Sequence, residues 1–334
     1  MQKRNFAING IGRIGKNIFR KYFEQENNNW NLSAINLGEA NIESKIHLLK
    51  YDSVHGMFLG IEDYNDNEII VRGKKIKIIT ERNIENIEWG KLGVDVVLEC
   101  TGQFNTREKA ALHIKKGAAR VLVSAPCKNA DKTIIRGVNC GDISSQDTII
   151  SVASCTTNCL APIAKVINDD LGIESGFMTT IHSYTNDQRI IDGGHKDLRR
   201  ARSAALSIIP TSTGAVKSMD LVLPELKGKL GCSAIRVPTP NVSMIDFTFN
   251  SSKDTSVKYI NDLFKGIVKE NNYKGIVDYV SEKLVSVDFN HTTASAIFDS
   301  TETSVIKDRL CRVVAWYDNE WAFSCRMFEI LEKL

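Results

Sequence analysis

One cysteine and one histidine of this 334-residue chain have the surroundings of a nucleophile and its base. Cys155 lies in the segment SCTTN, residues 154–158, after a strand-like run and before a run that opens a helix. A helix N-terminus stabilises a thiolate through its dipole and its free N–H groups, so Cys155 is a candidate nucleophile at neutral pH. His182 ends a second strand-like run, residues 177–182, at the start of a polar loop. From there its ring can reach and activate an active-site thiol.

Both residues also have structural interpretations. Any one of eight cysteines is more often a buried free thiol, and a lone histidine is more often a satisfied structural residue. Cys155 and Cys159 have the spacing of a metal-binding pair, but no second pair of ligands at zinc-like spacing follows. The sequence therefore predicts no metal site.

A glycine pattern near the start of the chain predicts a dinucleotide site. Residues 10–15, GIGRIG, follow a strand-like run at 5–9 and precede apolar residues at helical spacing. In this order the glycines allow a tight turn and a close approach to a pyrophosphate, which the helix N-terminus binds. The alternative is an ordinary glycine turn. The pattern also expects an acidic residue roughly 20 positions later for the ribose hydroxyls. The second strand-like run instead ends in Asn36, Leu37 and Gly38, with Glu39 after them.

Arginines provide candidate sites for an anionic ligand. Residues 195–202 form a basic loop, and Arg236 stands alone in an apolar strand-like run. Charge runs are usually solvated surface, which is the interpretation we favour for Arg199 and Arg202. Arg200 and Arg236 are the better candidates for a phosphate, because a guanidinium can donate two hydrogen bonds to its oxygens.

The elements that must position these residues change character near residue 154. Before it, strand-like runs at 32–35, 94–98, 121–123 and 148–152 alternate with helical stretches, of which 106–116 is the clearest. This alternation is typical of parallel strands with crossover helices on both faces. Residues 1–154 are therefore expected to form a Rossmann-type, doubly wound α/β domain.

After Cys155, strand-like runs follow one another at 177–182, 234–237, 243–249, 285–289 and 313–316. This order predicts an α+β catalytic domain, residues 155–316, with a mostly antiparallel sheet. An amphipathic helix at 257–268, with Asp254 or Thr255 as its N-cap, is expected to cover one face of that sheet. A final helix within 317–334 is expected to pack back on the first domain.

Composition excludes several classes of protein. The chain has 43 Lys and Arg against 40 Asp and Glu, a net charge of +3, and 43% hydrophobic residues. That mixture is neither disordered nor a disulfide scaffold, and without a basic stripe it argues against nucleic acid as the main ligand. No apolar run approaches the roughly 18 residues of a membrane span, and residues 1–10 lack the apolar stretch of a secretory signal. We expect a cytoplasmic protein with free thiols and no membrane partner.

Six segments together resemble one known family. They are residues 8–15 (INGIGRIG), 154–158 (SCTTN), 182–188 (HSYTNDQ), 197–202 (DLRRAR), 236–240 (RVPTP) and 316–321 (WYDNEW). In content and order they resemble the phosphorylating, type I glyceraldehyde-3-phosphate dehydrogenases over essentially the whole chain. The resemblance implies that Cys155 adds to the aldehyde of D-glyceraldehyde 3-phosphate and that His182 activates the thiol and accepts the hydroxyl proton. Hydride would pass to NAD or NADP, and inorganic phosphate would cleave the thioester to 1,3-bisphosphoglycerate, a step of glycolysis and gluconeogenesis.

The same resemblance implies further site residues. For the substrate phosphate and the attacking phosphate they are Ser154, Thr156, Thr185, Asp187, Arg200, Thr213, Gly214 and Arg236. For the cofactor they are Gly10, Gly12, Arg13, Ile14, Gly15, Leu37, Arg82, Ser124 and Asn319. The resemblance also implies a homotetramer in which the loop 183–202 crosses toward the cofactor of a neighbour.

Two departures from the family pattern bear on the cofactor. Leu37 stands where NAD-preferring members usually carry Asp, and Gly193 and Gly194 stand where they usually carry Leu-Pro. Loss of a carboxylate removes repulsion of a 2′-phosphate, and two glycines leave room for it. We therefore expect dual or NADP-leaning specificity, although the sequence shows no new Lys or Arg beside Leu37.

Two other functions remain as alternatives. Erythrose-4-phosphate dehydrogenase resembles this family and shares its cysteine and histidine, but residues 185–188 and 211–214 look more like the triose enzymes. The other alternative is a non-catalytic, cofactor-sensing or RNA-binding protein on the same fold. Retention of both Cys155 and His182 argues against it.

Overall fold

The computed structural model describes residues 3–25 and 29–334. Met1 and Gln2, which belong to the amino-terminal segment considered above for a secretory signal, lie outside the described residues. Contacts divide the chain into two units. The first holds the residues up to Ile134, Cys140–Ala153 and Ser324–Leu334, and the second holds Ile135–Asn139 and Ser154–Phe323.

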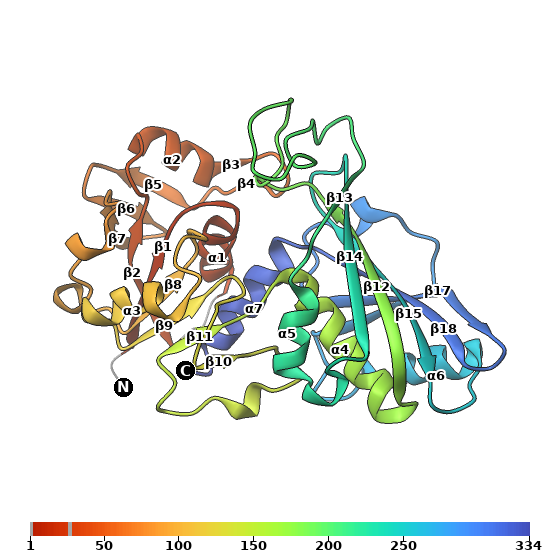
Figure 1. Cartoon of the computed structure of the whole chain (residues 1–334). Helices are drawn as coiled ribbons and strands as arrows, with labels where there is room; N and C mark the ends of the chain where they lie inside the picture. Colours follow the sequence, from red (N-terminus) through yellow and green to blue (C-terminus); the bar gives the residue numbers. More distant parts are fainter. Residues whose placement is uncertain (1–2, 26–28) are drawn as a thin grey trace. The chain divides into compact units, whose positions relative to one another are not determined.

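The first unit is built on a sheet whose order, over the described residues, is β10-β11-β9-β8-β1-β2-β7-β6-β5 (Figure 1). From β10 to β7 all neighbours are parallel, and β5 and β6 extend the edge antiparallel. Strand order reverses between β1 and β8, the position at which doubly wound sheets bind ligands. The predicted Rossmann-type fold is thereby confirmed. The strands are β1 (Arg4–Asn9), β2 (Trp30–Asn36), β5 (Ile61–Tyr64), β6 (Glu68–Val71), β7 (Lys74–Ile79), β8 (Val96–Glu99), β9 (Arg120–Val123), β10 (Lys132–Thr133) and β11 (Ile149–Ser151), with a separate hairpin of β3 (Tyr51–Asp52) and β4 (Gly56–Met57).

Helices α1 (Arg13–Glu24), α2 (Ile42–Lys50) and α3 (Arg107–Lys115) belong to this unit. The side chain of Thr106 accepts a hydrogen bond from the backbone N–H of Lys109 and fixes the start of α3 where the sequence predicts it. Asn41 caps α2 in the same way. Short 3₁₀ turns are η1 (Ile84–Asn86), η2 (Gly90–Leu92) and, later, η3 (Cys140–Asp142).

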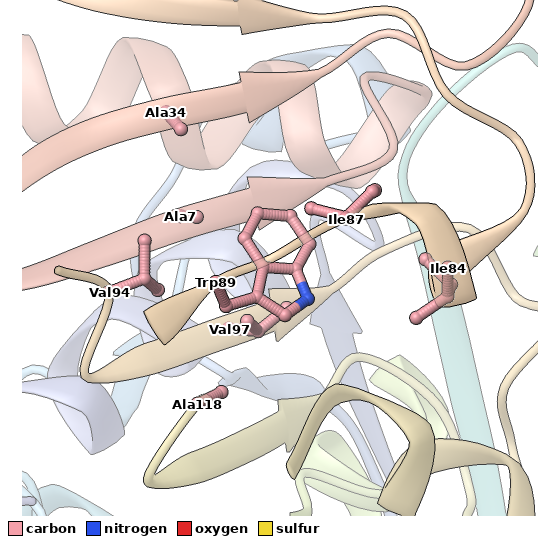
Figure 2. Packing of buried hydrophobic residues seen from close by; sticks show 8 residues of the cluster. All are labelled: Ala7, Ala34, Ile84, Ile87, Trp89, Val94, Val97 and Ala118. Atoms are coloured by element: carbon pink, nitrogen blue, oxygen red, sulfur yellow. The ribbon is translucent and has the colours of Figure 1, made fainter. Parts of the chain in front are cut away.

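A compact apolar cluster surrounds the indole of Trp89, as Figure 2 shows. It packs the segment 84–94 against β1, β2 and β8, so that loop is held to the sheet by burial of apolar surface. The indole itself is fully buried. The members of this Trp89 cluster are Ala7, Ala34, Ile84, Ile87, Trp89, Val94, Val97 and Ala118.

The second unit has a sheet of order β13-β14-β12-β15-β18-β17-β16 within the part of the chain that is described. Most neighbours are antiparallel, as predicted, but β12 and β14 run parallel, as do β16 and β17. The parallel pairing sets His182 on β12 directly beside Arg236 on β14. The strands are β12 (Ile173–Ser183), β13 (Ile209–Thr211), β14 (Leu230–Val237), β15 (Ser243–Ser251), β16 (Val277–Val280), β17 (Ala296–Ile306) and β18 (Leu310–Tyr317).

Two sequence predictions about this unit were wrong. Segment 285–289 is not a strand but the 3₁₀ turn η5 (Ser286–Phe289), because the Asp288 carboxylate accepts a hydrogen bond from the Val285 N–H and folds the chain back. The N-cap of α6 is Ser256, whose hydroxyl accepts from the Tyr259 N–H, rather than Asp254 or Thr255. The remaining elements are α4 (Cys155–Asp170), α5 (Ala215–Val222), α6 (Val257–Ile267), η4 (Pro224–Leu226) and the terminal helix α7 (Trp321–Leu331).

Across residues 3–25 and 29–334, no helix has the length and apolar content that crossing a membrane requires.

Candidate active site

The glycine turn between β1 and α1 is shaped by three different requirements. Gly10 has φ +95°, and a Cβ there would lie 2.7 Å from the Thr101 side chain. A Cβ on Gly15 would lie 2.0 Å from the carbonyl oxygen of Gly10, so only glycine lets α1 approach the strand this closely. A Cβ on Gly12, the N-cap of α1, would have no heavy atom within 4 Å, and the glycine supplies no capping side chain. The helix start thus faces open space, which is the arrangement that binds a phosphate.

A cavity of about 280 Å³ opens at this turn, within the first unit. Of the residues predicted for the cofactor, Gly10, Gly12, Leu37 and Arg82 line it. The mixture of glycine, amide and apolar side chains fits one end of a dinucleotide. Its lining comprises Asn9, Gly10, Ile11, Gly12, Asn36, Leu37, Gly38, Glu39, Ala40, Lys45, Glu81, Arg82, Ile84, Cys100, Thr101, Gln103 and Phe104.

The end of β2 shapes the part of the cavity where an acidic residue is expected. Leu37 occupies that position and is only 4% exposed. Glu39 is among the residues that line the cavity, and so is Lys45 of α2, which the sequence did not indicate. The Glu81 carboxylate is engaged within its own loop, accepting hydrogen bonds from the Asn83 N–H and the Asn86 amide.

The other predicted cofactor residues of the first unit do not line this cavity. The Arg13 guanidinium pairs with Asp52 at 2.6 Å, and Lys16 binds the same carboxylate at 2.6 Å. Burial of Asp52 opposes its ionisation, but the hydrogen bonds from Lys16 and Arg13, together with those from the His55 and Val54 N–H groups, hold its pKa well below the usual range. Ile14 belongs to the first turn of α1, and Ser124 directly follows β9.

Cys155 is the first residue of α4. The preceding Ala153 has φ +54°, a left-handed conformation that is costly for a residue with a Cβ. Ser154 then caps the helix, its hydroxyl accepting from the Thr157 N–H at 3.1 Å. The strained turn and the cap together present the Cys155 thiol at the helix N-terminus, as the sequence predicts.

His182, at the end of β12, lies against this thiol. Its Nε2 is 3.5 Å from the Cys155 Sγ, and its Nδ1 is 2.7 Å from the Ser183 carbonyl oxygen. When Nδ1 carries the hydrogen and donates it to Ser183, Nε2 is free to accept the thiol proton. In the other tautomer Nδ1 accepts from the Arg236 Nη1, 2.8 Å away, and Nε2 carries the hydrogen. The geometry is that of a nucleophile with an oriented base.

Burial dominates the electrostatics of the pair. Burial raises the pKa of the Cys155 thiol, and the charge of Arg236 and the Thr156 N–H offset only part of this rise. Burial is thus the largest influence on the pKa of this thiol. Burial, together with Arg236, lowers the pKa of His182 to about 3, so the imidazole is neutral near pH 7.

The hydroxyl of Tyr317 joins the elements around the pair. It lies 2.9 Å from both the Thr156 and the Thr180 hydroxyls, and its ring meets the His182 ring edge-to-face at 5.9 Å. Tyr317 is buried, so it fixes α4, β12 and β18 at the point where the reacting atoms lie. Apart from its place in the segment 316–321, no sequence signal singled it out.

The two arginines predicted to bind phosphate have different surroundings. Arg200 is held by the carboxylates of Asp187 and Asp197 and donates to the Ser212 carbonyl oxygen. Arg236 forms no ion pair with a carboxylate among the described residues, and its buried Nε has no hydrogen-bond partner there. Its Nη1 lies 2.8 Å from the His182 Nδ1 and 3.1 Å from the Ser183 oxygen. Arg236 is therefore the arginine with free capacity for an anion beside Cys155.

The remaining predicted residues of the second unit lie as follows. The Thr185 hydroxyl donates to the Gln188 side chain, and the Thr213 hydroxyl accepts from the Ala215 N–H. Gly214 is the N-cap of α5 and provides no capping side chain, so beyond the Ala215 N–H, which donates to the Thr213 hydroxyl, the helix start can donate to an anion. The Asn319 side-chain oxygen accepts hydrogen bonds from the Ser183 and Ser243 hydroxyls.

A Rossmann-type sheet with a glycine-turn cavity, and a second sheet with an oriented cysteine–histidine pair, define a dinucleotide-binding oxidoreductase. Comparison with known proteins specifies which kind. Residues 4–107 match the NAD binding domain of glyceraldehyde 3-phosphate dehydrogenase, and residues 154–319 match its C-terminal domain. The chain belongs to the glyceraldehyde-3-phosphate dehydrogenase family.

Individual relatives match nearly end to end. The chain is 51% identical to glyceraldehyde-3-phosphate dehydrogenase of Cereibacter sphaeroides over 322 residues, which are 96% of this chain and 95% of that protein. It is 51% identical to the Geobacillus stearothermophilus protein of that name over 326 residues, 97% of this chain and 96% of the relative. The Zymomonas mobilis protein of the same name is 49% identical over 325 residues, again 97% and 96%.

Proposed function

We propose that this protein oxidises D-glyceraldehyde 3-phosphate to 1,3-bisphosphoglycerate, with reduction of NAD or NADP and incorporation of inorganic phosphate. The observation that carries the proposal is the Cys155 thiol at the start of α4, 3.5 Å from the His182 Nε2, in a chain of this family. An aldehyde carbon bears no hydroxyl and cannot easily lose hydride until a nucleophile adds to it, and a thiol with a neighbouring base supplies that nucleophile.

The chain's own groups perform the successive steps. His182 Nε2 takes the thiol proton while Sγ bonds to the aldehyde carbon, and it returns that proton to the former carbonyl oxygen, giving a hemithioacetal and a neutral imidazole. The bound nicotinamide supplies a hydride acceptor. His182 receives the hydroxyl proton as hydride leaves, and a thioester remains on Cys155. A phosphate oxygen then attacks the thioester carbon, the carbon–sulfur bond breaks, and the released product is an acyl phosphate. The leaving Cys155 sulfur takes back the proton held by His182, which restores the thiol and the neutral imidazole.

Anion sites complete the proposal. Arg236, with its free guanidinium capacity, binds the substrate phosphate, and Arg200, Thr185 and Asp187 shape that site. The attacking phosphate binds at the start of α5. Its ligands there are Ser154, Thr156, Thr213 and Gly214.

The cavity of the first unit fits a nicotinamide dinucleotide, and we propose that it accepts both NAD and NADP. Gly12 leaves room for the pyrophosphate at the start of α1. Leu37 provides no carboxylate to repel a 2′-phosphate, and Lys45 brings a cation to the same cavity. We place Arg13, Ile14 and Gly15 at the turn, Arg82 and Ser124 along the cofactor and Asn319 at its carboxamide.

The test replaces the nucleophile and the base separately. Cys155→Ser should lower kcat more than roughly a thousandfold, because the covalent route is lost. His182→Asn should lower it by roughly 10²–10⁴-fold, the usual contribution of a general base. Cys159→Ala, a buried thiol one turn further along α4, is the matched control and should retain activity. Cys155→Ser with undiminished aldehyde oxidation would contradict the proposal.

Omission of phosphate tests the second half of the reaction. With glyceraldehyde 3-phosphate and no phosphate, the enzyme should form about one equivalent of reduced cofactor per active site and then stop, because the thioester accumulates. Faster, phosphate-independent turnover of erythrose 4-phosphate would instead identify the longer aldehyde as the substrate.

A further inference from the structure

A chain of buried hydrogen bonds lies beside the dinucleotide cavity of the first unit. Glu99, the last residue of β8, is at its centre and is only 1% exposed. Among the described residues its carboxylate has no lysine or arginine partner, and its one ion-pair neighbour is His113. A buried carboxylate without a cation is costly unless donors satisfy it, so the arrangement of those donors has to account for it.

The first donor to Glu99 is His113, and its tautomer is determined by Trp89, whose indole N–H can only donate. Its Nε1 lies 3.0 Å from the Nδ1 of His113, which must therefore be an acceptor. A neutral His113 then carries its hydrogen on Nε2 and donates it to the Glu99 Oε2 at 3.0 Å. His113 is fully buried, and its ring lies 5.9 Å from the equally buried Trp89 ring in a tilted contact, so the surrounding packing holds both rings in place.

Further donors occupy the rest of the carboxylate. The Thr101 N–H donates to Oε1 at 2.7 Å, the Thr101 hydroxyl donates to the same oxygen, and the Asn9 amide donates to Oε2 at 2.6 Å. Every neighbour presents a hydrogen, so the Glu99 carboxyl oxygens act as the acceptors for all of them.

The direction of these bonds continues to the lining of the cavity. Because the Asn9 amide nitrogen is used by Glu99, its oxygen faces Asn36 and accepts from that amide at 2.7 Å. The Asn36 oxygen in turn faces the backbone and accepts from the Gly38 and Glu81 N–H groups, each at 3.1 Å. Both backbone segments, and both asparagines, line the cavity.

We propose that Glu99 is a positioning residue for the cofactor: its buried carboxylate fixes the orientation of the Asn9 and Asn36 amides and so holds the loops after β2 and β7 ready for the dinucleotide ribose. The inference rests on the proposed function, because it assumes that this cavity takes a nicotinamide dinucleotide.

The substitution Glu99→Gln tests the donor pattern with almost no change in size. Its amide oxygen must stay with the Thr101 N–H, so its NH₂ group faces Asn9 and His113, which both present hydrogens. Asn9 and then Asn36 have to turn over, and the Gly38 and Glu81 N–H groups lose their acceptor. Glu99→Asp keeps the carboxylate but shortens the side chain, so its affinity for NAD is expected to lie between those of the wild type and Glu99→Gln.

The experiment measures the dissociation constant of NAD by titration calorimetry on the full-length protein. Glu99→Gln should bind NAD at least roughly tenfold more weakly, the loss of one or two buried hydrogen bonds. Its Cys155 should still react with iodoacetamide at the wild-type rate without cofactor, because that thiol lies in the other unit. The matched control, Glu88→Gln, removes an exposed carboxylate and should bind as the wild type does.

A second measurement uses the wild-type protein, so its result does not depend on whether a variant folds. In ¹⁵N-histidine-labelled wild-type protein at pH 7, His113 should be the neutral Nε2–H tautomer. An Nδ1–H or a doubly protonated ring would overturn the inference. So would Glu99→Gln binding NAD within twofold of wild type. If wild-type protein binds neither NAD nor NADP, the proposed function fails, while the His113 tautomer still reports on the hydrogen-bond chain itself.

Discussion

At the scale of single residues, position 37 carries the main question about the cofactor. Leu37 lines the dinucleotide cavity where a carboxylate would face the ribose, and Lys45 lines the same cavity from α2. A carboxylate close to a 2′-phosphate repels it, whereas an ammonium attracts it, and residues of both kinds line the cavity: Glu39 and Glu81 as well as Lys45 and Arg82. Of the two cations, Lys45 is the one that the sequence did not reveal. Lys45 is eight positions further along the chain, and only the packing of α2 brings it back.

We therefore expect wild-type kcat/KM values for NAD and NADP within a hundredfold of each other, a difference of less than about 2.7 kcal/mol. Leu37→Asp should lower kcat/KM for NADP by roughly tenfold or more and leave NAD equal or improved. Lys45→Met should lower the value for NADP alone. Steady-state kinetics with both cofactors measures this, and a wild-type enzyme that rejects NADP by a hundredfold or more would contradict it.

Residue types and spacing were enough to find Cys155, His182 and the glycine turn, because each follows from local chemistry at the end of one element. The buried chain through Glu99 and His113 could not be found in this way. Its members come from β1, β2, β8, α3 and the segment before β8, and only the sheet order brings them together. Tyr317 was missed for the same reason.

At the scale of elements, the packing of α1 on β1 separates the roles of two glycines. Gly15→Ala places a Cβ 2.0 Å from the Gly10 oxygen and should destabilise the protein by about 3 kcal/mol or more. In Gly12→Ala the new Cβ has no heavy atom within 4 Å, and the backbone at this position has φ −88°, which alanine adopts readily. The variant should therefore fold normally, but its methyl group should obstruct the pyrophosphate. Urea unfolding and NAD titration of both variants measure the two effects. A Gly12→Ala protein that binds NAD with wild-type affinity would contradict the proposed role of this turn.

Element prediction succeeded where hydrophobic pattern and backbone agreed, as in β12 and α3. It failed at residues 285–289, where Val285, Val287 and Phe289 alternate like one face of a strand. Val285 is 60% exposed and Val287 71%, so this pattern does not report burial. The local hydrogen bond from the Val285 N–H to Asp288 decides the turn, and a period-2 pattern carries no information about it.

At the scale of the whole molecule, the loop between β12 and β13 exposes an unusual number of large apolar side chains. Ile191 is 78% exposed and Leu198 82%, and Leu206 is 87% exposed. Exposed apolar surface of this extent is typical of a subunit interface. It supports the expectation that the protein is a homotetramer in which this loop meets a neighbouring subunit.

Sedimentation velocity should therefore give the mass of four chains. The double substitution Ile191→Glu and Leu198→Glu should shift the protein to smaller species, because it introduces charge into the apolar surface. Tyr259→Glu, on the exposed face of α6, is the control and should leave the mass unchanged. A wild-type monomer would refute the expected assembly.

The first unit is completed by the last eleven residues, because Ser324–Leu334 belong to it, and Phe328 packs edge-on against Phe6 at 6.2 Å. A ribosome makes the chain from its amino terminus, and domains generally fold in the order in which they emerge. Here the amino-terminal sheet emerges first but waits for the final helix to cover Phe6 and Tyr22. The nascent chain therefore exposes Phe6 and Tyr22 until the final helix has been made. A premature stop codon that removes Ser324–Leu334 would destabilise the first unit, although most of that unit lies at the other end of the sequence.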